Sequence, residues 1–462
     1  MSGKGVWRGR GALWRTGVAV LVVALLAAGL VAAALVTNVD GDPPGVEAAP
    51  AVRGPVPGLE AVGADAPAPD PAALDRVLAP LADAPAAGDL TARVVDDATG
   101  RVLWERRPLD ARVPASTTKL LTAVAALTLL PADARVETVL AEGPEPDTLV
   151  VIPGGDPTMS GGAEPGPLFP GAGTVARAAE AVRSAGLRPA RIVVDPGPYA
   201  GPGLGPGWSA ADIGGGNIAP VEPWMLDSGR VDAADEYSPR VDEPMLAAGR
   251  ALARALDADP DAVRLADAPV QVGRELGRVP SAPLTERLRS MLVHSDNVLA
   301  EAVCREVALA RHPGQRADFA AGTAAVLETL AERGIDVSGV RLDDCSGMSP
   351  GNRVSAAVLT DVLRAAAAPD ATRDMRDLLD TLPVAGATGT LADRYSGPSA
   401  SGAGWVRAKT GTLSGTSALA GTVTSADGRS MSFALLSSGT NPADARPALD
   451  RFAAALRDCG CR

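Results

Sequence analysis

Three short polar motifs constrain this 462-residue chain more than any other feature. In chain order they are Ser116-x-x-Lys119, Ser295-Asp296-Asn297 and Lys409-Thr410-Gly411. Each motif alone often arises by chance, but the ordered combination, with each member in a suitable local setting, is much harder to obtain by accident. A fold that uses all three must bring distant segments of the chain to one place.

Hydrophobic patterning around the motifs predicts a mixed α/β (α+β) fold. Two β-rich runs, residues 90–95 and 101–105, are joined by a turn-forming stretch and predict a hairpin. Further strand patterns lie at residues 404–411, 417–424 and 430–437. Helical patterns lie at residues 72–81, 116–127, 284–293, 298–310, 317–333 and 442–457. Strands near both ends, with helices between them, indicate an antiparallel sheet with flanking helices to which both ends of the folded chain contribute.

Residues 131–280 differ in character from the rest of the folded chain. They hold short β-like runs at 148–152 and 191–195, a helical pattern at 174–186, and many Gly- and Pro-rich loops. No G-K-[ST] follows those glycines, so we interpret them as ordinary loops and not as a phosphate cradle. We expect one or two inserted domains here, while residues 72–130 and 281–462 form the domain that carries the motifs.

The N-terminal segment has the pattern of a membrane signal. Basic residues precede an uncharged apolar run at residues 17–36, which is long enough to cross a bilayer as a helix. We expect residues 1–36 to be a cytoplasmic basic segment followed by a signal anchor, with cleavage as a signal peptide left open. Residues 37–71 are rich in Pro, Ala and Gly and are expected to form a disordered linker. The remainder of the chain would then lie outside the cytoplasm.

Composition excludes several functional classes. The net charge of −12 argues against nucleic-acid binding, which favours a basic face. The chain has two histidines, His294 and His312, and no H-E-x-x-H motif, so we expect neither a zinc peptidase site nor any other metal or cofactor. A Ser-His-Asp triad would have to use one of these histidines, and we expect His294 to be a structural or surface residue.

Four cysteines bear on the compartment and on the framework of the fold. A disulfide is permitted outside the cytoplasm, and a bridge between Cys304 and Cys345 is weakly favoured over two buried thiols. A bridge between Cys459 and Cys461 would close a strained ring and is not expected.

The first motif suits nucleophilic catalysis without a histidine. The Ser116 hydroxyl needs a neighbour that takes its proton, and Lys119, three residues further along the same helix, would lie on the same face. Lys119 can act as a base only if burial and a nearby positive charge, such as that of Lys409, lower its pKa. A serine at a helix start has a structural alternative as an ordinary N-cap.

The second motif suits proton transfer and the positioning of groups. Ser295 could relay a proton to a leaving amine. Asn297 has both a donor and an acceptor, which suits a grip on a backbone amide or on Lys119.

The third motif suits the binding of a peptide end. Lys409 and Thr410 could bind a substrate carboxylate, while Gly411 would let the substrate backbone lie against an edge strand. The backbone N–H groups of Ser116 and Thr412 are candidates for an oxyanion hole at the positive end of a helix dipole.

With these motifs, the chain resembles the D-alanyl-D-alanine carboxypeptidase/endopeptidases of peptidase family S13, the low-molecular-mass class C penicillin-binding proteins. The resemblance extends from about residue 88 to 440 and includes 114–119 (P-A-S-x-x-K), 154–157 (G-G-D-P), 207–212 (G-W-x-x-x-D), 294–297 (H-S-D-N), 346–349 (S-G-M-S), 382–391 (L-P-x-A-G-x-x-G-T-L) and 408–413 (A-K-T-G-T-L). It implies a transpeptidase/β-lactamase-like domain with additional domains inserted between the first two motifs. It also implies peptidoglycan stem peptides as substrates, β-lactams as covalent inhibitors, and the nucleophile and base assigned above.

The resemblance further implies a role for Asp212, by position the residue that helps to bind the free end of the substrate's diaminopimelic acid side chain. A solvated loop carboxylate is the alternative for this residue. The arginine that tends to follow S-G-L-S in the family is replaced here by Pro350, with Arg353 slightly later, which leaves the diamino-acid preference open. Two other functions stay in competition: a β-lactamase-like hydrolase, and a catalytically weak scaffold that binds peptidoglycan.

Overall fold

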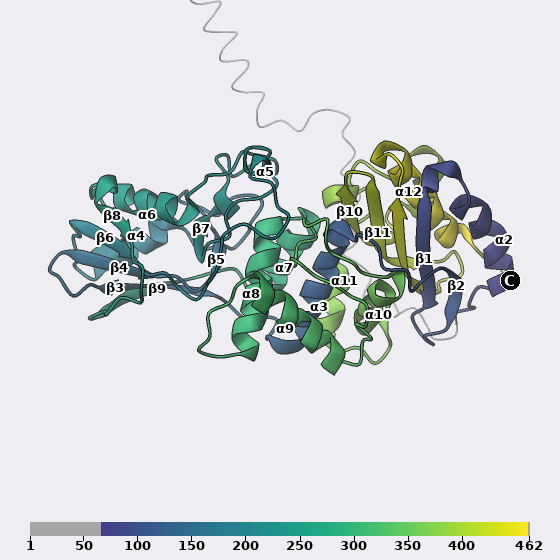
Figure 1. Ribbon diagram of the computed structural model, residues 1–462, viewed down its shortest axis with the longest axis horizontal. Coiled ribbons are helices and arrows are strands. Elements are labelled where there is room, and N and C mark those ends of the chain that lie inside the picture. The colour runs from purple at the N-terminus through teal and green to yellow at the C-terminus, as the bar shows by residue number, and fades with distance from the viewer. Residues whose placement is uncertain (1–65, 461–462) are drawn as a thin grey trace, which may run out of the picture. The chain divides into compact units, whose positions relative to one another are not determined.

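The computed structural model describes residues 66–460 (Figure 1). The expected signal anchor at residues 17–36 and most of the expected linker lie outside this range. Among the described helices, none is long and apolar enough to cross a membrane. The first of them, α2 (Pro71–Ala82), is capped by Asp70, whose carboxylate accepts a hydrogen bond from the backbone N–H of Ala73 at 2.9 Å.

The main sheet has five antiparallel strands in the order β10-β11-β12-β1-β2. Their bounds are β1 Asp89–Asp96, β2 Val102–Arg106, β10 Val406–Leu413, β11 Thr416–Thr424 and β12 Ser430–Ser438. Asp89 of β1 lies opposite Ser438 of β12, so strands from the two ends of the folded chain pair side by side (Figure 1). This confirms the predicted fold class and leaves β10, which carries the third motif, at one edge of the sheet.

The two faces of this sheet carry side chains of different size. Large residues such as Leu419 and Phe433 pack with α2 and α12 (Pro442–Asp458). The alternate residues Ala418 and Ala420 face the core of the helical layer. Small side chains on this face let the helices approach the sheet closely.

The helical layer contains α3, α7, α8, α9, α10 and α11, with bounds Lys119–Leu129, Leu284–Val293, Asn297–Arg311, Phe319–Glu332, Ala356–Ala367 and Arg373–Thr381. Most residues of α3 are buried, which explains its nearly unbroken apolar sequence. The sequence analysis did not predict α10 and α11. Ser355 and Thr372 cap these helices by accepting hydrogen bonds from the backbone N–H groups of Val358 and Met375, so cap residues were the available signal.

Between α3 and α7 the chain builds a second sheet with its own hydrophobic core. Its strands, in the order β8-β6-β4-β3-β9, have the bounds Val263–Leu265, Arg191–Val194, Thr148–Ile152, Glu137–Glu142 and Glu275–Pro280. The same part of the chain contains α4 (Val175–Ser184), α6 (Pro244–Ala255) and a short parallel pair, β5 (Asp156–Met159) with β7 (Trp224–Leu226). We refer to residues 131–280 below as the inserted segment, and the division of these residues into inserted domains stays a prediction.

Disulfides follow the prediction at one place and depart from it at another. Cys304 and Cys345 are bonded, with their Cα atoms 6.1 Å apart, which confirms the favoured pairing. Cys459 is also disulfide-bonded. The sequence analysis did not expect a bridge between Cys459 and Cys461 and offered no other partner for Cys459, so it did not predict this bond.

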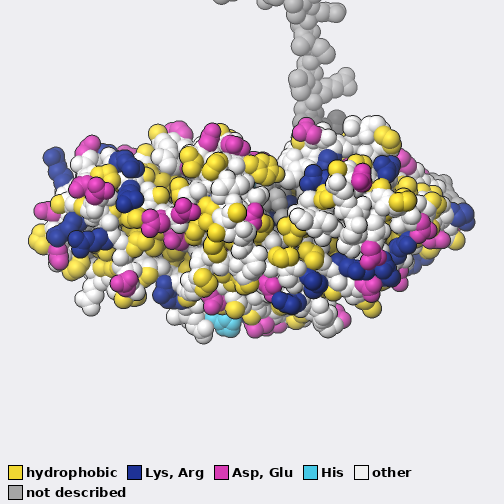
Figure 2. Space-filling view, turned by 45° about the horizontal axis from the view of Figure 1, so that its top comes forward, with side chains coloured by type: hydrophobic (Ala, Val, Ile, Leu, Met, Phe, Trp, Pro, Cys, Tyr) yellow, Lys and Arg dark blue, Asp and Glu magenta, His cyan; other side chains and the backbone are white. Residues whose placement is uncertain are grey.

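Charge is mixed on the face of the molecule that Figure 2 shows. On the face shown in Figure 2, basic and acidic side chains are interspersed with apolar and neutral ones. The net charge of −12 is therefore not gathered into one acidic patch on this face.

Candidate active site

The turn that carries Ser116 is tighter than predicted. Ser116 lies in a 3₁₀ turn, η2 (Ala115–Thr118), and α3 begins only at Lys119, so the prediction of an α-helix is wrong for residues 116–118. Ala115 has a left-handed backbone with φ of 46°, which a residue other than glycine rarely adopts. Side chains three residues apart eclipse one another in a 3₁₀ turn, so Ser116 and Lys119 still share a face.

Two glycines let neighbouring segments reach the Ser116 turn. A Cβ atom on Gly347 would stand 1.8 Å from the carbonyl oxygen of Ala115. A Cβ atom on Gly411 would stand 2.7 Å from the carbonyl oxygen of Pro114 and 3.1 Å from the backbone nitrogen of Ser116. The close approach of β10 to this turn thus requires glycine at 411, a reason that the sequence analysis did not consider.

Lys119 is wholly buried at the start of α3. Its Nζ donates hydrogen bonds to Oγ of Ser116 at 3.0 Å, to Oδ1 of Asn297 at 2.6 Å and to the carbonyl oxygen of Ser346 at 2.7 Å. The amide Nδ2 of Asn297 in turn donates to the carbonyl oxygen of Asn217 at 2.9 Å. The first two motifs therefore meet at the amine of Lys119.

Burial lowers the pKa of Lys119 to about 8. The negative charges of Asp344, Asp296 and Glu301 oppose this shift. Burial, and not the predicted positive charge of Lys409, is therefore the main cause of the lowered pKa.

Lys409 forms a second serine–lysine pair. Its buried Nζ donates to Oγ of Ser295 at 2.9 Å and to the carbonyl oxygen of Thr410 at 3.0 Å. Burial lowers the pKa of Lys409 well below its ordinary value, and the positive charges of Lys119 and Arg394 lower it further. The carboxylate of Glu236 opposes this shift without forming an ion pair with Lys409.

The second motif lies at the junction of α7 and α8. Ser295 has a left-handed backbone with φ of 57°. Asp296 caps α8 by accepting from the backbone N–H of Leu299 at 2.7 Å, and it forms buried ion pairs with Arg230 at 2.7 Å and Arg240 at 3.5 Å. Burial disfavours the carboxylate of Asp296, but the two guanidinium groups hold its pKa far below its ordinary value. Residues of the inserted segment thereby fix the loop that presents Ser295.

The strand that carries the third motif offers an open edge. A preceding segment covers only the start of β10, where the backbone N–H of Ala408 donates to the carbonyl oxygen of Pro383 at 3.0 Å. Backbone groups alternate along an antiparallel strand, so the N–H groups of Thr410 and Thr412 face the same side as that of Ala408. No further strand of the sheet covers these two residues within the described part of the chain.

A cleft of about 450 Å³ brings most of the predicted site residues together. Its wall includes Ser116, Ser295, Asn297, Thr410, Thr412 and Asp212. Asp212 is half-buried and comes from α5 (Ala211–Gly214) in the inserted segment. Lys119 and Lys409 are buried behind this wall and contact it through Ser116 and Ser295.

Several residues of the wall were not predicted. His294 lines the cleft and hydrogen-bonds Glu236 of the inserted segment through Nδ1. Thr410 donates a hydrogen bond to Oγ1 of Thr390 at 2.9 Å. Arg394 adds a positive charge near the third motif. The sequence signal for these contacts was absent or confined to the family resemblance, because each partner lies far away along the chain.

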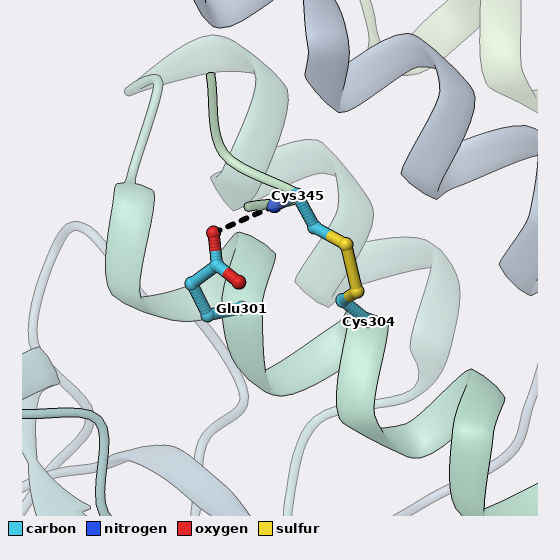
Figure 3. Close-up of side chains that lie close together, drawn as sticks. All are labelled: Glu301, Cys304 and Cys345. Atoms are coloured by element: carbon cyan, nitrogen blue, oxygen red, sulfur yellow. Dashed lines mark hydrogen bonds between the residues drawn. A yellow bond between two sulfur atoms is a disulfide. The ribbon is translucent and has the colours of Figure 1, made fainter. Parts of the chain in front are cut away.

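Behind the cleft, Glu301, Cys304 and Cys345 form a buried cluster (Figure 3). Their ligand-type atoms lie within 4.8 Å of one another, as in a metal site. Both sulfur atoms belong to the disulfide, so neither is available as a thiolate ligand in this state. Glu301 instead uses its carboxylate to accept hydrogen bonds from the backbone N–H groups of Cys345 at 2.9 Å and Ser346 at 2.8 Å.

Curated proteins resemble this chain over most of its length. Residues 73–239 and 232–457 match the model of the D-Ala-D-Ala carboxypeptidase 3 (S13) family. Carboxypeptidase DacB of Mycolicibacterium smegmatis is 43% identical over 451 residues, which cover 96% of this chain and 97% of that protein. A carboxypeptidase of Mycobacterium tuberculosis is 42% identical over 414 residues, which cover 87% of this chain and 88% of that protein.

Solved structures share the fold. Penicillin binding protein 4 of Haemophilus influenzae matches with a TM-score of 0.67 and 22% identity, over 84% of this chain and 98% of that chain. Another structure of the same Haemophilus protein contains a β-lactam. From the family match and the two carboxypeptidase relatives, the chain belongs to the S13 family of D-Ala-D-Ala carboxypeptidases.

Proposed function

We propose that this chain is a penicillin-sensitive serine-type D-Ala-D-Ala carboxypeptidase and DD-endopeptidase that acts on peptidoglycan stem peptides through an acyl-enzyme on Ser116. Its family makes it a hydrolase of the D-Ala-D-Ala carboxypeptidase type. The observation that carries the mechanism is the 3.0 Å hydrogen bond between Oγ of Ser116 and Nζ of the buried Lys119. With its pKa lowered to about 8, Lys119 is partly neutral at physiological pH, whereas an ordinary lysine is almost wholly charged.

In acylation, Oγ of Ser116 attacks the carbonyl carbon of the penultimate D-Ala while its proton passes to Nζ of Lys119. The backbone N–H groups of Ser116 and Thr412 stabilise the resulting oxyanion. The alternation of backbone groups along β10 supports this role for Thr412. As the C–N bond breaks, Ser295 relays the proton that Lys119 took up to the departing amine of the terminal D-Ala, and water then hydrolyses the ester on Ser116, which frees the serine and leaves a carboxylate on the peptide.

Asn297 holds the base in place during these steps. Its Oδ1 accepts from Lys119 and its Nδ2 donates to the backbone of Asn217, so both of its polar atoms already have partners. This pattern favours a role for Asn297 in orienting Lys119 and not in binding the substrate amide.

Lys409 and Thr410 bind the terminal carboxylate of the substrate. In the described part of the chain Lys409 makes no salt bridge, and a substrate carboxylate would favour its charged form. Gly411 keeps β10 close to Ser116, and Asp212 binds the free amine of the diamino acid. The position of Asp212 in the same cleft as Ser116 supports its role.

We place the enzyme outside the cytoplasm, tethered to the cell membrane by residues 17–36, as their apolar run and basic flank indicate. The disulfide between Cys304 and Cys345 supports an oxidising compartment. A reporter enzyme that works only outside the cytoplasm should be active when it is fused to the C-terminus, and one that works only in the cytoplasm should be inactive. Recovery of the full-length chain as a soluble cytoplasmic protein would refute this location.

The test of the function is release of D-Ala from a pentapeptide that ends in D-Ala-D-Ala. The purified protein should release D-Ala, and penicillin should block the release. Ser116→Ala should release none, while Ser414→Ala, a control at an exposed serine in the turn after β10, should match the unaltered protein. Release by Ser116→Ala at the normal rate would refute the proposal.

A further inference from the structure

One face of α8 binds both Lys119, the proposed base, and a segment of the chain that contacts Lys119. Asn297, Glu301 and Cys304 are spaced four and three residues apart on this helix, so they share a face. Asn297 contacts Lys119 directly. The other two bind residues 344–349, which we call the anchor segment: Glu301 by hydrogen bonds and Cys304 by the disulfide (Figure 3).

The carboxylate of Glu301 and the amine of Lys119 both form hydrogen bonds with the backbone of Ser346 in the anchor segment. Oε1 of the wholly buried Glu301 accepts from the backbone N–H groups of Cys345 and Ser346. The carbonyl oxygen of Ser346 accepts from Nζ of Lys119 at 2.7 Å. The backbone of Ser346 therefore links the carboxylate to the amine.

We propose that Glu301 is a positioning residue for acylation, which fixes Nζ of Lys119 beside Ser116 by holding the Ser346 carbonyl in place. The disulfide between Cys304 and Cys345 is a second tether of the same segment. The inference rests on the proposed role of Lys119 as the base, and it adds a residue that does not itself touch the substrate.

The charge of Glu301 also acts on Lys119. The charged groups that face Glu301 are Arg305 on its own helix, Asp344 from the anchor segment and Lys119 from α3. Burial, with help from Asp344, raises the pKa of Glu301 to about 7, so the carboxylate is largely ionised near pH 8, where Lys119 titrates. Ionised Glu301 raises the pKa of Lys119. Removal of this charge must therefore lower the pKa of Lys119 and move the acid limb of the rate profile to lower pH.

Two substitutions separate the positioning from the charge. Glu301→Gln keeps an oxygen for the two backbone amides but removes the charge, so the acid limb of kcat/KM should move down by about half to one pH unit. Glu301→Ala removes the oxygen as well, so kcat should fall roughly 10- to 100-fold while KM for the peptide stays within about threefold. Glu306→Gln is the matched control, because Glu306 lies on the same helix but pairs with Arg287.

The experiment measures acylation by penicillin and turnover of the pentapeptide for the full chain across about pH 6 to 10, with Lys119→Ala alongside. An acid limb that Glu301→Gln leaves in place would overturn the inference, even if Glu301→Ala failed to fold. A loss of thermal stability with normal kcat and a normal pH profile would also overturn it. If Lys119→Ala acylated at the normal rate, the proposed function would fail instead. If Lys119→Ala were inactive while both Glu301 variants behaved normally, only this inference would fail.

Discussion

The two serine–lysine pairs of the cleft have nearly equal geometry and different surroundings. The distance from Nζ to Oγ is 3.0 Å between Lys119 and Ser116 and 2.9 Å between Lys409 and Ser295, and both lysines are buried. The amine of Lys119 also donates to Asn297 and to a backbone carbonyl, and three carboxylates oppose the loss of its charge. Lys409 has one further backbone acceptor and lies in the field of two other cations.

This difference teaches that the surroundings, more than the hydrogen-bond distance, assign a role to each pair. Lys119 is held by three hydrogen bonds and titrates at a pH where it can take and return a proton. The charged form of Lys409 is unfavourable until an anion binds next to it. The first pair therefore suits a nucleophile with its base, and the second suits a receptor for a carboxylate.

The largest expected effect is that of Lys119→Ala. Loss of a general base typically costs about 10²- to 10⁴-fold, so acylation by penicillin should fall by that factor while the far-UV circular dichroism stays normal. His294→Ala is the control, because histidine is the usual base in serine hydrolases. A benign Lys119→Ala combined with a damaging His294→Ala would contradict the assignment of the first pair.

A smaller effect should distinguish the second pair. Lys409→Ala should weaken kcat/KM for the pentapeptide by about 2–4 kcal/mol, roughly 30- to 1,000-fold, because a buried charge-assisted contact is lost. A peptide whose terminal carboxylate is amidated should already react poorly and should lose little more with this variant. Equal losses on the acid and the amide would show that Lys409 does not act through the carboxylate.

Asp212 belongs to neither pair, and its substitution should slow only the reaction with peptides that carry the free amine. A charge-assisted hydrogen bond to the free amine contributes about 1.5–3 kcal/mol, so Asp212→Asn should weaken kcat/KM roughly 10- to 100-fold for peptides with that amine. Reaction with a penicillin that lacks the amine should barely change. Equal losses on both ligands would indicate a structural role, and no loss on either would indicate a solvated loop carboxylate.

The smallest effect concerns pH. Only neutral Lys119 can take the serine proton, so the acylation rate should fall about tenfold per pH unit below the lowered pKa of about 8. Lys409→Ala should leave this limb within about half a unit, because burial, and not the charge of Lys409, is the main cause of the lowered pKa of Lys119. A limb that moves by more than one unit would show that the two lysines titrate as a pair.

Local patterns predicted the main sheet, because β1, β11 and β12 have β-rich sequences and recognisable turns. The same reasoning missed β9, where Glu275–Pro280 lacks strict alternation and owes its strand to pairing with β3. The motifs also predicted that Ser116 and Asn297 would meet, and both residues line the same cleft.

Contacts between distant segments were beyond the reach of sequence patterns. Nothing near Asp296 in the sequence indicates its partners Arg230 and Arg240, which come from the inserted segment. The role of Gly411 depends on how closely β10 approaches the Ser116 turn, which only packing decides. The left-handed backbone of Ala115 could not be predicted either, because alanine has no local preference for it.

The most direct test of the account is the site of the penicillin adduct. The full chain is incubated with penicillin, digested, and analysed by tandem mass spectrometry for the residue that carries the added mass. The account predicts an adduct on Ser116 that disappears in Ser116→Ala and forms with the control Ser414→Ala. An adduct on Ser295 or on any other residue, or undiminished labelling of Ser116→Ala, would contradict it.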